Sequence, residues 1–255
     1  MDLGIRGKVA LVTGASSGIG EAVARALAGE GVKLAVAARR LARLEQVAAG
    51  ARADFGVEAR AFAADQTDPS SLTRLVAEVE AQLGPVEILV VNGGGPKPGT
   101  YTQVRPDDWD AAYKLTLQSA LRLVDAVLPG MRQRRWGRIV ALESTSVKQP
   151  IPSLVLSNAF RSAVVAALKT LSGEVAAEGI TVNAIATGLV TTDRFRGIYD
   201  TAEKVANALA KVPIRRAANP EEFAPMVAFL CGVPASYVTG QTLSIDGGLT
   251  AGLFG

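Results

Sequence analysis

The segment Thr13-Gly14-Ala15-Ser16-Ser17-Gly18-Ile19-Gly20 decides the fold of this chain. It lies between an apolar run, Lys8–Thr13, that predicts a buried strand and a segment, Ile19–Glu30, that predicts a helix. Its glycines permit a tight turn, a close approach of the backbone to a diphosphate, and close packing of the helix on the strand. The free N–H groups and the positive dipole end of such a helix attract anions. The segment therefore predicts a strand–turn–helix unit that binds a dinucleotide.

Short apolar runs and segments of helical length alternate along the rest of the chain. This alternation implies a mainly parallel sheet with right-handed crossovers, and the apolar runs fit strands buried on both faces. We expect an α/β fold in one domain over residues 1–255: a Rossmann-type, doubly wound parallel sheet of about seven strands with helices on both faces. The further predicted strands are Lys33–Ala38, Ala59–Ala64, Val86–Val91, Arg138–Leu142, Thr181–Ala186 and Gln241–Ile245. The further predicted helices are Leu41–Ala53, Pro69–Leu83 with Asp68 as N-cap, Asp107–Arg132, Leu154–Ala177, Ala202–Lys211 and Glu221–Leu230, and residues 187–199 are expected to be irregular.

Composition excludes several classes of chemistry. The 255 residues include no histidine, which excludes Ser-His hydrolases, histidine-ligated zinc and histidine general acids. The single cysteine, Cys231, excludes an internal disulfide and a cysteine-clustered metal site. Its apolar surroundings predict an inert, buried thiol. We therefore expect no metal site.

Neither a membrane nor a nucleic acid is an expected partner. No apolar run reaches the roughly 18 to 20 residues that cross a bilayer, and Met1–Gly4 lacks the layout of a signal peptide. The net charge is +3, and the densest basic patch, Arg132–Arg138, is expected to be a solvated connection between a helix and a strand. We expect a cytoplasmic protein.

The glycine segment also carries a family resemblance. Thr-Gly-x-x-x-Gly-Ile-Gly resembles the nucleotide motif of the short-chain dehydrogenase/reductase family, and the likeness continues through Gly7–Ala10, Tyr237–Gln241 and Ile245–Gly248. The chain is most similar to bacterial proteins that resemble 3-oxoacyl-(acyl carrier protein) reductase. The resemblance implies a nicotinamide-dependent oxidoreductase with a small-molecule or acyl-carrier substrate. It also implies a homotetramer packed through the helices Asp107–Arg132 and Leu154–Ala177.

The end of the second predicted strand indicates which nicotinamide cofactor is bound. NAD-preferring relatives place an acid there for the ribose 2′-hydroxyl, whereas this chain has Arg39 and Arg40 and no carboxylate. The family pattern implies Arg39 as the main contact to a 2′-phosphate, with help from Ser16, Ser17 or Arg40. We therefore expect NADP(H) rather than NAD(H). The alternative is that both arginines only cap a surface helix.

The resemblance implies the remaining cofactor contacts. Asp65 and Gln66 take the place of an adenine-binding pair, and Asn92-Gly93-Gly94-Gly95 takes the place of an Asn-Asn-Ala-Gly motif. Thr187–Thr192 matches the Pro-Gly-x-x-x-Thr segment that holds the carboxamide, with Thr187 in place of proline. The expected cofactor-binding residues are Gly14, Ser16, Ser17, Gly18, Ile19, Gly20, Arg39, Arg40, Asp65, Gln66, Asn92, Gly93, Gly94, Arg161, Thr187, Gly188, Val190 and Thr192.

Four family positions that carry catalysis can be compared one at a time. Ser144 matches the catalytic serine after the fifth strand. Ser157 stands at the tyrosine, Arg161 at the lysine one helical turn further, and Thr116 at the helix asparagine. A serine hydroxyl is a far weaker acid than the tyrosine, and an arginine with a pKa above about 12 cannot relay protons. The resemblance therefore implies a site whose proton transfer has changed.

Two roles are open for Arg161, and three residues are candidates for the proton donor. Arg161 either binds ribose hydroxyls or a substrate anion, or it pairs with Glu143 at the strand end. Lys148 lies on the loop that borders the family's active site, and Tyr113 and Tyr199 are the other candidate donors. The expected catalytic set is Ser144, Ser157, Arg161, Lys148 and Thr116.

Two functions follow. The first is an NADP(H)-dependent carbonyl reductase for a 3-oxoacyl thioester-like compound or a small ketone, with a non-standard or water-relayed proton donor. The second is a catalytically degenerate NADP(H)-binding protein that acts as a sensor or assembly partner. A short lid over residues 187–215 is expected to border the substrate. There, Arg194 and Arg196 either favour an anionic or acyl-carrier substrate or are solvated charges.

Overall fold

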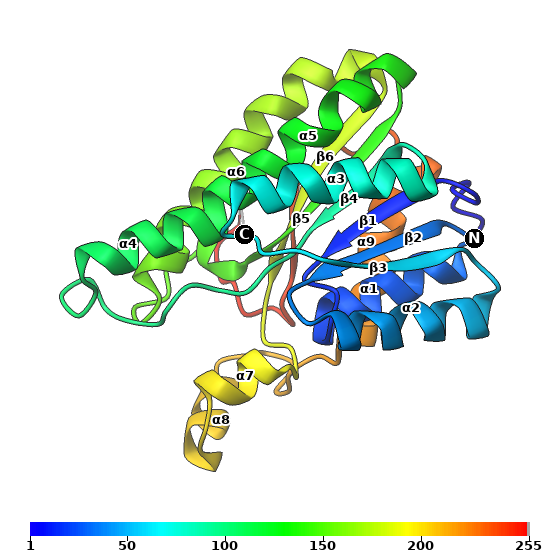
Figure 1. Cartoon of the computed structure of the whole chain (residues 1–255). Coiled ribbons are helices and arrows are strands. Elements are labelled where there is room, and N and C mark those ends of the chain that lie inside the picture. The colour runs from blue at the N-terminus through cyan, green and yellow to red at the C-terminus, as the bar shows by residue number, and fades with distance from the viewer. Residues whose placement is uncertain (254–255) are drawn as a thin grey trace.

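The strands of the computed structural model, which describes residues 1–253, form one parallel sheet (Figure 1). The strand order is β3-β2-β1-β4-β5-β6-β7, and each strand runs parallel to its neighbours. This order confirms the predicted doubly wound sheet, whose ligand crevice opens at the carboxyl ends of the strands where the order reverses, between β1 and β4. The strands are β1 (Val9–Thr13), β2 (Lys33–Ala38), β3 (Ala59–Ala63), β4 (Val86–Val91), β5 (Gly137–Ser144), β6 (Ile180–Thr187) and β7 (Thr242–Ile245).

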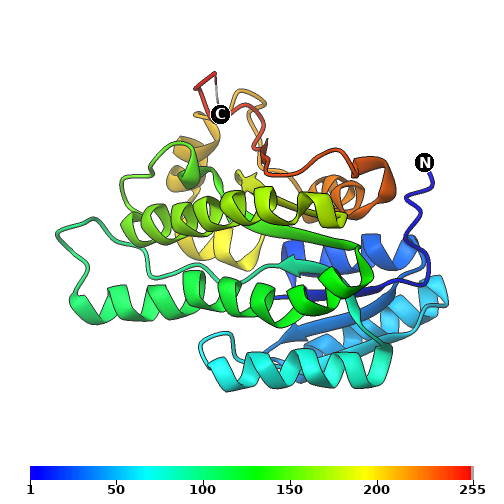
Figure 2. The ribbon, with the colours of Figure 1, turned by 90° about the horizontal axis from the view of Figure 1, so that it is seen from above.

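Helices cover both faces of the sheet, as the view from above shows (Figure 2). On one face, α1 (Gly18–Gly29), α2 (Leu41–Phe55) and α9 (Pro220–Cys231) enclose a core that includes Leu27 and Phe223. On the other face, α3 (Pro69–Leu83), α5 (Ser119–Arg134) and α6 (Val155–Val175) enclose a second core. None of the helices described for residues 1–253 combines the length and the apolar character that a membrane span requires. Three short helical turns lie between these elements: η2 (Thr145–Val147), η3 (Ala176–Glu178) and η4 (Val233–Ala235).

Two local signals in the sequence have the predicted structure. Asp68 is the N-cap of α3, where its Oδ1 accepts the Ser70 N–H over 2.9 Å and Pro69 occupies the first helical position. Cys231 is buried at the end of α9, and burial raises the pKa of its thiol to about 12. The structure confirms that Cys231 is buried, and a protonated thiol agrees with the prediction that it is inert.

The helix predicted over Asp107–Arg132 is interrupted. It consists of α4 (Pro106–Ala112), a π-helical turn η1 (Tyr113–Gln118) and α5. Apolar spacing along the sequence does not reveal a π turn, which inserts a residue into the helix and occurs frequently at functional sites. Thr116 lies in this turn, where it is 8% exposed and its hydroxyl has no hydrogen-bond partner among the described residues.

The segment 187–199, expected to be irregular, contains a helix. It is α7 (Asp193–Ile198), and Thr192 Oγ1 caps it by accepting the Phe195 N–H over 3.2 Å. A second lid helix, α8 (Ala202–Leu209), follows. Both helices stand away from the sheet (Figure 1), on the segment that leaves the carboxyl end of β6.

Arg138 corrects the expectation that Arg132–Arg138 is a solvated connection. It is 3% exposed, and its Nη1 donates to the carbonyl oxygens of Gly137 and Gly179 over 2.8 and 3.1 Å. Its guanidinium also lies 4.5 Å from the ring centroid of Trp136. Carbonyl oxygens and the indole face therefore replace water around this cation, and the second residue of β5 is a buried arginine.

Candidate active site

The turn between β1 and α1 is so tight that a side chain does not fit at its glycine positions. Gly14 and Gly18 each have a φ of 60°, a left-handed conformation that favours glycine. A side chain on Gly20 would collide with the carbonyl oxygen of Gly14. Ser17, the N-cap of α1, makes no side-chain capping bond, so the first-turn N–H groups stay open to an anion. The turn therefore fits the diphosphate of a dinucleotide.

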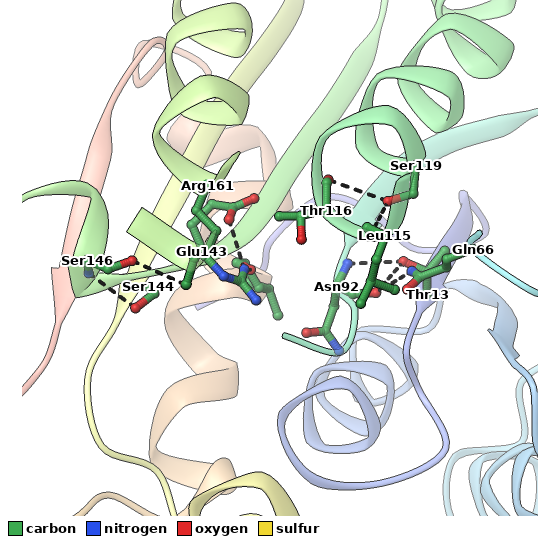
Figure 3. Close-up of polar contacts among 12 residues, drawn as sticks. Thr13, Gln66, Asn92, Leu115, Thr116, Ser119, Glu143, Ser144, Ser146 and Arg161 are labelled. Atoms are coloured by element: carbon green, nitrogen blue, oxygen red, sulfur yellow. Dashed lines mark hydrogen bonds and ion pairs between the residues drawn. The ribbon is translucent and has the colours of Figure 1, made fainter. Parts of the chain in front are cut away.

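Asn92, after the end of β4, ties this turn to the neighbouring strand (Figure 3). Its carbonyl oxygen accepts the Thr13 hydroxyl over 2.8 Å, and its Nδ2 donates to the Gly14 carbonyl oxygen over 3.1 Å. Gln66 Nε2 donates to the same Asn92 carbonyl oxygen over 2.8 Å. A side chain on Gly93 would collide with Gln66. Gln66, expected at the adenine ring, thus holds the loop after β4 in this structure.

One guanidinium and two hydroxyls gather at the carboxyl end of β2. Arg40 Nη2 donates to Ser16 Oγ and to Ser17 Oγ, each over 3.0 Å. The cluster contains no carboxylate, and its donors suit a phosphate. The structure therefore places Arg40 beside the two serines, whereas the sequence pointed to Arg39 as the main contact.

Asp65 and Arg39 lie near each other at the carboxyl edge of the sheet. Asp65 Oδ1 accepts the N–H and the hydroxyl of Thr67 over 2.9 and 2.8 Å. These hydrogen bonds lower the pKa of Asp65, and the charge of Arg39 lowers it further. Asp65 is therefore ionised and held in place where the sequence predicts an adenine contact.

A cavity of about 630 Å³ opens beside the glycine turn. Its walls come from the ends of β4, β5 and β6, the start of α6, and the lid helices α7 and α8. Lys148 does not line it but lies half-buried after η2, and Thr116 lines a separate, smaller cavity. Of the residues predicted for the site, the large cavity brings together Ile19, Asn92, Gly93, Ser144, Ser157, Arg161, Thr187, Gly188, Val190 and Thr192.

Arg161 and Glu143 form an ion pair in the wall of this cavity (Figure 3). Arg161 Nη1 lies 2.8 Å from Glu143 Oε2 and also donates to the Leu142 carbonyl oxygen over 3.2 Å. The side chains are 12% and 4% exposed, respectively. Burial raises the pKa of Glu143, and the charge of Arg161 partly opposes this rise. Of the two roles open for Arg161, the structure shows the pairing with Glu143.

The serines of the site differ in what their hydroxyls can do. Ser144 Oγ accepts the Ser146 N–H over 3.1 Å, and no acceptor among residues 1–253 takes the Ser144 proton. Ser144 is half-buried and lines the cavity, so its proton can be donated there. Ser157 is 4% exposed, and its Oγ lies 3.4 Å from Ser146 Oγ. Ser144 is thus the better placed hydrogen-bond donor for a ligand.

A small polar cavity of about 20 Å³ lies behind the ion pair. Its lining includes Thr116, Glu143 and Arg161. The unpartnered Thr116 hydroxyl is therefore close to the pair, in a space about large enough for one water. Thr116 belongs to the same polar cluster as Arg161 without lining the large cavity.

Residues of α7 and its ends line the cavity, and sequence reasoning missed the helix that positions them. The sequence offers Tyr199 as a candidate proton donor and Arg194 as a candidate contact for an anionic substrate, both on a segment expected to be irregular, and it gives no role to Phe195. The threonine N-cap followed by Asp193 was a signal that could have located this helix. The cavity-lining side chains of the two lid helices and Tyr199 are Arg194, Phe195, Ile198, Tyr199, Lys204, Asn207 and Ala208.

Known proteins are similar to this chain over nearly its whole length. Residues 14–250 match the family model described as enoyl-(acyl carrier protein) reductase. The chain is 34% identical over 247 residues to a 3-oxoacyl-[acyl-carrier-protein] reductase of Salmonella typhimurium, covering 97% of this chain and 99% of that protein. Its structure is similar to that of L-sorbose reductase from Gluconobacter frateurii complexed with NADPH and L-sorbose, with a TM-score of 0.94, 33% identity, and coverage of 99% and 100% of the two chains. It is also similar to YwfH, an NADPH-dependent reductase involved in bacilysin biosynthesis, with a TM-score of 0.93, 27% identity, and coverage of 97% and 100%.

Removal of one partner of the buried pair is expected to destabilise the fold. Glu143→Gln leaves the Arg161 charge without a counter-charge and should lower the free energy of unfolding in urea by about 3 kcal/mol. The double variant Glu143→Leu/Arg161→Met should recover most of this loss. As a control, Asp200→Asn breaks the exposed pair with Lys204 and should leave the free energy of unfolding nearly unchanged. Equal stability of Glu143→Gln and the unaltered protein would show that Arg161 needs no counter-charge.

Proposed function

The chain belongs to the short-chain dehydrogenase/reductase family, and from this premise we propose that it is an NADP(H)-dependent oxidoreductase that reduces a carbonyl group. The large cavity supports the proposal most strongly. It places the glycine turn that fits a dinucleotide beside Ser144, whose hydroxyl proton is available to a ligand. Bound NADPH would supply the hydride. The second candidate is an NADP(H)-binding protein without catalysis, and the exchanges at Ser157, Arg161 and Thr116 favour it.

The donors around Arg40 support NADP(H) as the cofactor. A guanidinium with two serine hydroxyls gives charge-assisted hydrogen bonds to a phosphate, and the hydrogen-bond partners of Arg40 among residues 1–253 include no acid that would bind a free ribose 2′-hydroxyl. The NADPH of the L-sorbose reductase complex and the NADPH dependence of YwfH agree with this choice. NAD(H) would leave the Arg40 cluster without its anion.

Ser144 and Arg161 would stabilise negative charge on the carbonyl oxygen. The Ser146 N–H occupies a lone pair of Ser144 Oγ and so directs the hydroxyl proton elsewhere, into the cavity. Arg161 lines the same wall and, although paired with Glu143, adds a fixed donor group there. Such preorganised donors act on charge that develops during the reaction.

Tyr199 is the proton donor that the geometry supports best. It lines the cavity, packs on Phe195 at 4.9 Å between ring centroids, and follows directly after α7. Burial raises the pKa of Tyr199, so the phenol holds its proton at neutral pH. The alkoxide formed by hydride addition is a much stronger base and would take that proton. By contrast, Tyr113 is 41% exposed, and Lys148 lies outside the cavity lining.

The family likeness also supports broader proposals about the protein's setting. A 3-oxoacyl thioester on an acyl carrier is the substrate suggested by the name of the Salmonella typhimurium relative, and a small ketone is the proposed alternative. A cytoplasmic homotetramer is proposed, with α5 and α6 as the packing helices.

The reductase proposal is tested by NADPH oxidation with acetoacetyl thioesters, diketones and quinones. We expect turnover of at least one compound, and Ser144→Ala should lower kcat about 100-fold while the Kd for NADPH stays unchanged. Loss of absorbance at the nicotinamide band measures turnover, and quenching of protein fluorescence measures binding. Tight NADPH binding without turnover of any compound would contradict the proposal and favour the non-catalytic protein.

The proton donor is tested by Tyr199→Phe. Loss of a general acid should lower kcat about 100-fold or more, with little change in the Kd for NADPH. Tyr237→Phe is the matched control, because Tyr237 is fully exposed. If Tyr199→Phe keeps the unaltered kcat, Lys148 or a water is the donor instead.

Cofactor selection is tested by Arg40→Gln. Loss of the charge should raise the Kd for NADPH about 10- to 100-fold, as expected for a charge-assisted hydrogen bond of about 1.5–3 kcal/mol, and leave the Kd for NADH unchanged. Arg60→Gln, at the amino-terminal end of β3, is the control. A larger effect from Arg39→Gln than from Arg40→Gln would assign the phosphate to Arg39.

A further inference from the structure

Arg194 reaches from the first turn of α7 to the loop that follows β4. Its Nη1 donates to the Gly95 carbonyl oxygen over 3.1 Å, and its Nη2 donates to the Pro96 carbonyl oxygen over 3.2 Å. A side chain on Gly95 would collide with the guanidinium. The residue is exposed at the surface, but its guanidinium is fixed at both terminal nitrogens and lines the cavity. The cation is therefore preorganised at the cavity wall.

The charges that line the cavity are unbalanced. The lining contains one carboxylate, Glu143, and four cations, Arg161, Arg194, Lys204 and Lys211. Glu143 is committed to Arg161, and Lys204 pairs with Asp200 over 2.7 Å. Arg194 has carbonyl partners but no carboxylate within 4.0 Å among residues 1–253. Carbonyl oxygens orient a guanidinium without cancelling its charge, so the cavity has a positive wall.

We infer that the substrate is a carbonyl compound that also bears a carboxylate, and that Arg194 binds this carboxylate while Ser144 holds the carbonyl oxygen. The inference rests on the proposed reductase function and, of the two substrate types proposed above, selects a small ketone that carries a carboxylate over a 3-oxoacyl thioester. Arginine presents a planar fork of donors that matches a carboxylate. The apolar lining at Ile151, Leu154 and Ile198 would contact the hydrocarbon part of the same molecule.

The cofactor diphosphate is the other anion that could reach this region. The turn at Gly14–Gly20 and the open N–H groups of α1 already fit that diphosphate. Although Arg194 is exposed overall, the cavity wall partly desolvates its guanidinium and so lowers the pKa of Arg194. The nearby charge of Arg161 lowers that pKa further. Because Arg161 lies in the wall with Ser144 and Ser157, Arg194 belongs to the reacting end of the cavity.

The experiment compares oxo acids with their methyl esters. The probes are 2-oxopentanoate, 4-oxopentanoate and 5-oxohexanoate, each against its methyl ester, with NADPH as reductant. The unaltered protein should show a kcat/KM at least tenfold higher for one or more of the acids, since a charge-assisted hydrogen bond contributes about 1.5–3 kcal/mol. Arg194→Met should reduce this acid-to-ester ratio to about one.

Two further variants separate position from charge. Arg196→Met, on the same helix, is the control because Arg196 is exposed and pairs with Asp193 over 2.6 Å. It should leave the ratio unchanged. Gly95→Ala keeps every charge but displaces the guanidinium, and it should lower the ratio at least threefold. An unchanged ratio in Arg194→Met would overturn the inference.

Binding measurements distinguish the remaining outcomes. If Arg194→Met raises the Kd for NADPH tenfold and leaves the ratio unchanged, Arg194 binds the cofactor diphosphate and the inference fails. If no acid or ester is turned over while NADPH binds, the reductase proposal fails, and calorimetry of the protein–NADP⁺ complex with the same probes still decides the inference. Tighter binding of an acid than of its ester, lost in Arg194→Met, would support a carboxylate site. Equal binding of acid and ester would overturn it.

Discussion

The buried ion pair between Arg161 and Glu143 fixes the wall of the large cavity beside Ser144 and Ser157. An arginine keeps its charge at any physiological pH, so a guanidinium that is 12% exposed requires polar or charged groups in place of water. Glu143 supplies such a group from the adjacent end of β5, at 2.8 Å. Arg161 is thereby held by the protein itself, through Glu143 and the Leu142 carbonyl oxygen. Under the proposed function, the proton would come from another part of the cavity, whose lining includes Tyr199.

The residues that fit the dinucleotide are held by contacts that do not involve the Arg161–Glu143 pair. The pair can therefore differ from the family pattern without a change in the dinucleotide site. The glycine turn depends on backbone contacts between β1, α1 and the loop after β4. Arg40 and its two serines lie at the end of β2. None of these contacts involves α6, which carries Ser157 and Arg161. Exchanges on α6 therefore alter the reacting end of the cavity without disturbing the dinucleotide site.

Features governed by local sequence could be predicted, and features governed by distant contacts could not. The sheet, the Asp68 cap and the buried Cys231 follow from apolar runs and from residues next to one another in the chain. Whether Arg161 binds a ligand or pairs with Glu143 depends on the distance between α6 and β5. The burial of Arg138 depends on carbonyl groups that lie far along the chain. Single-sequence patterns contain no such distances.

The lid and the π turn show a second limit. The helix α7 has only 6 residues, too few for an apolar period, although its threonine cap was readable. The π turn at Tyr113–Gln118 has the composition of an ordinary helix and is detectable only from its backbone. Both features contribute to the site. The lid supplies Arg194 and Tyr199 to the large cavity, and the π turn places Thr116 beside the ion pair.

The most direct test of this account is a crystal structure of the NADP⁺ complex that resolves the side chain of Arg161. Because the ion pair is buried, Arg161 should stay within hydrogen-bonding distance of Glu143 when the nicotinamide ribose is bound. Arg161 turned onto the ribose hydroxyls, with Glu143 left to another partner, would contradict it.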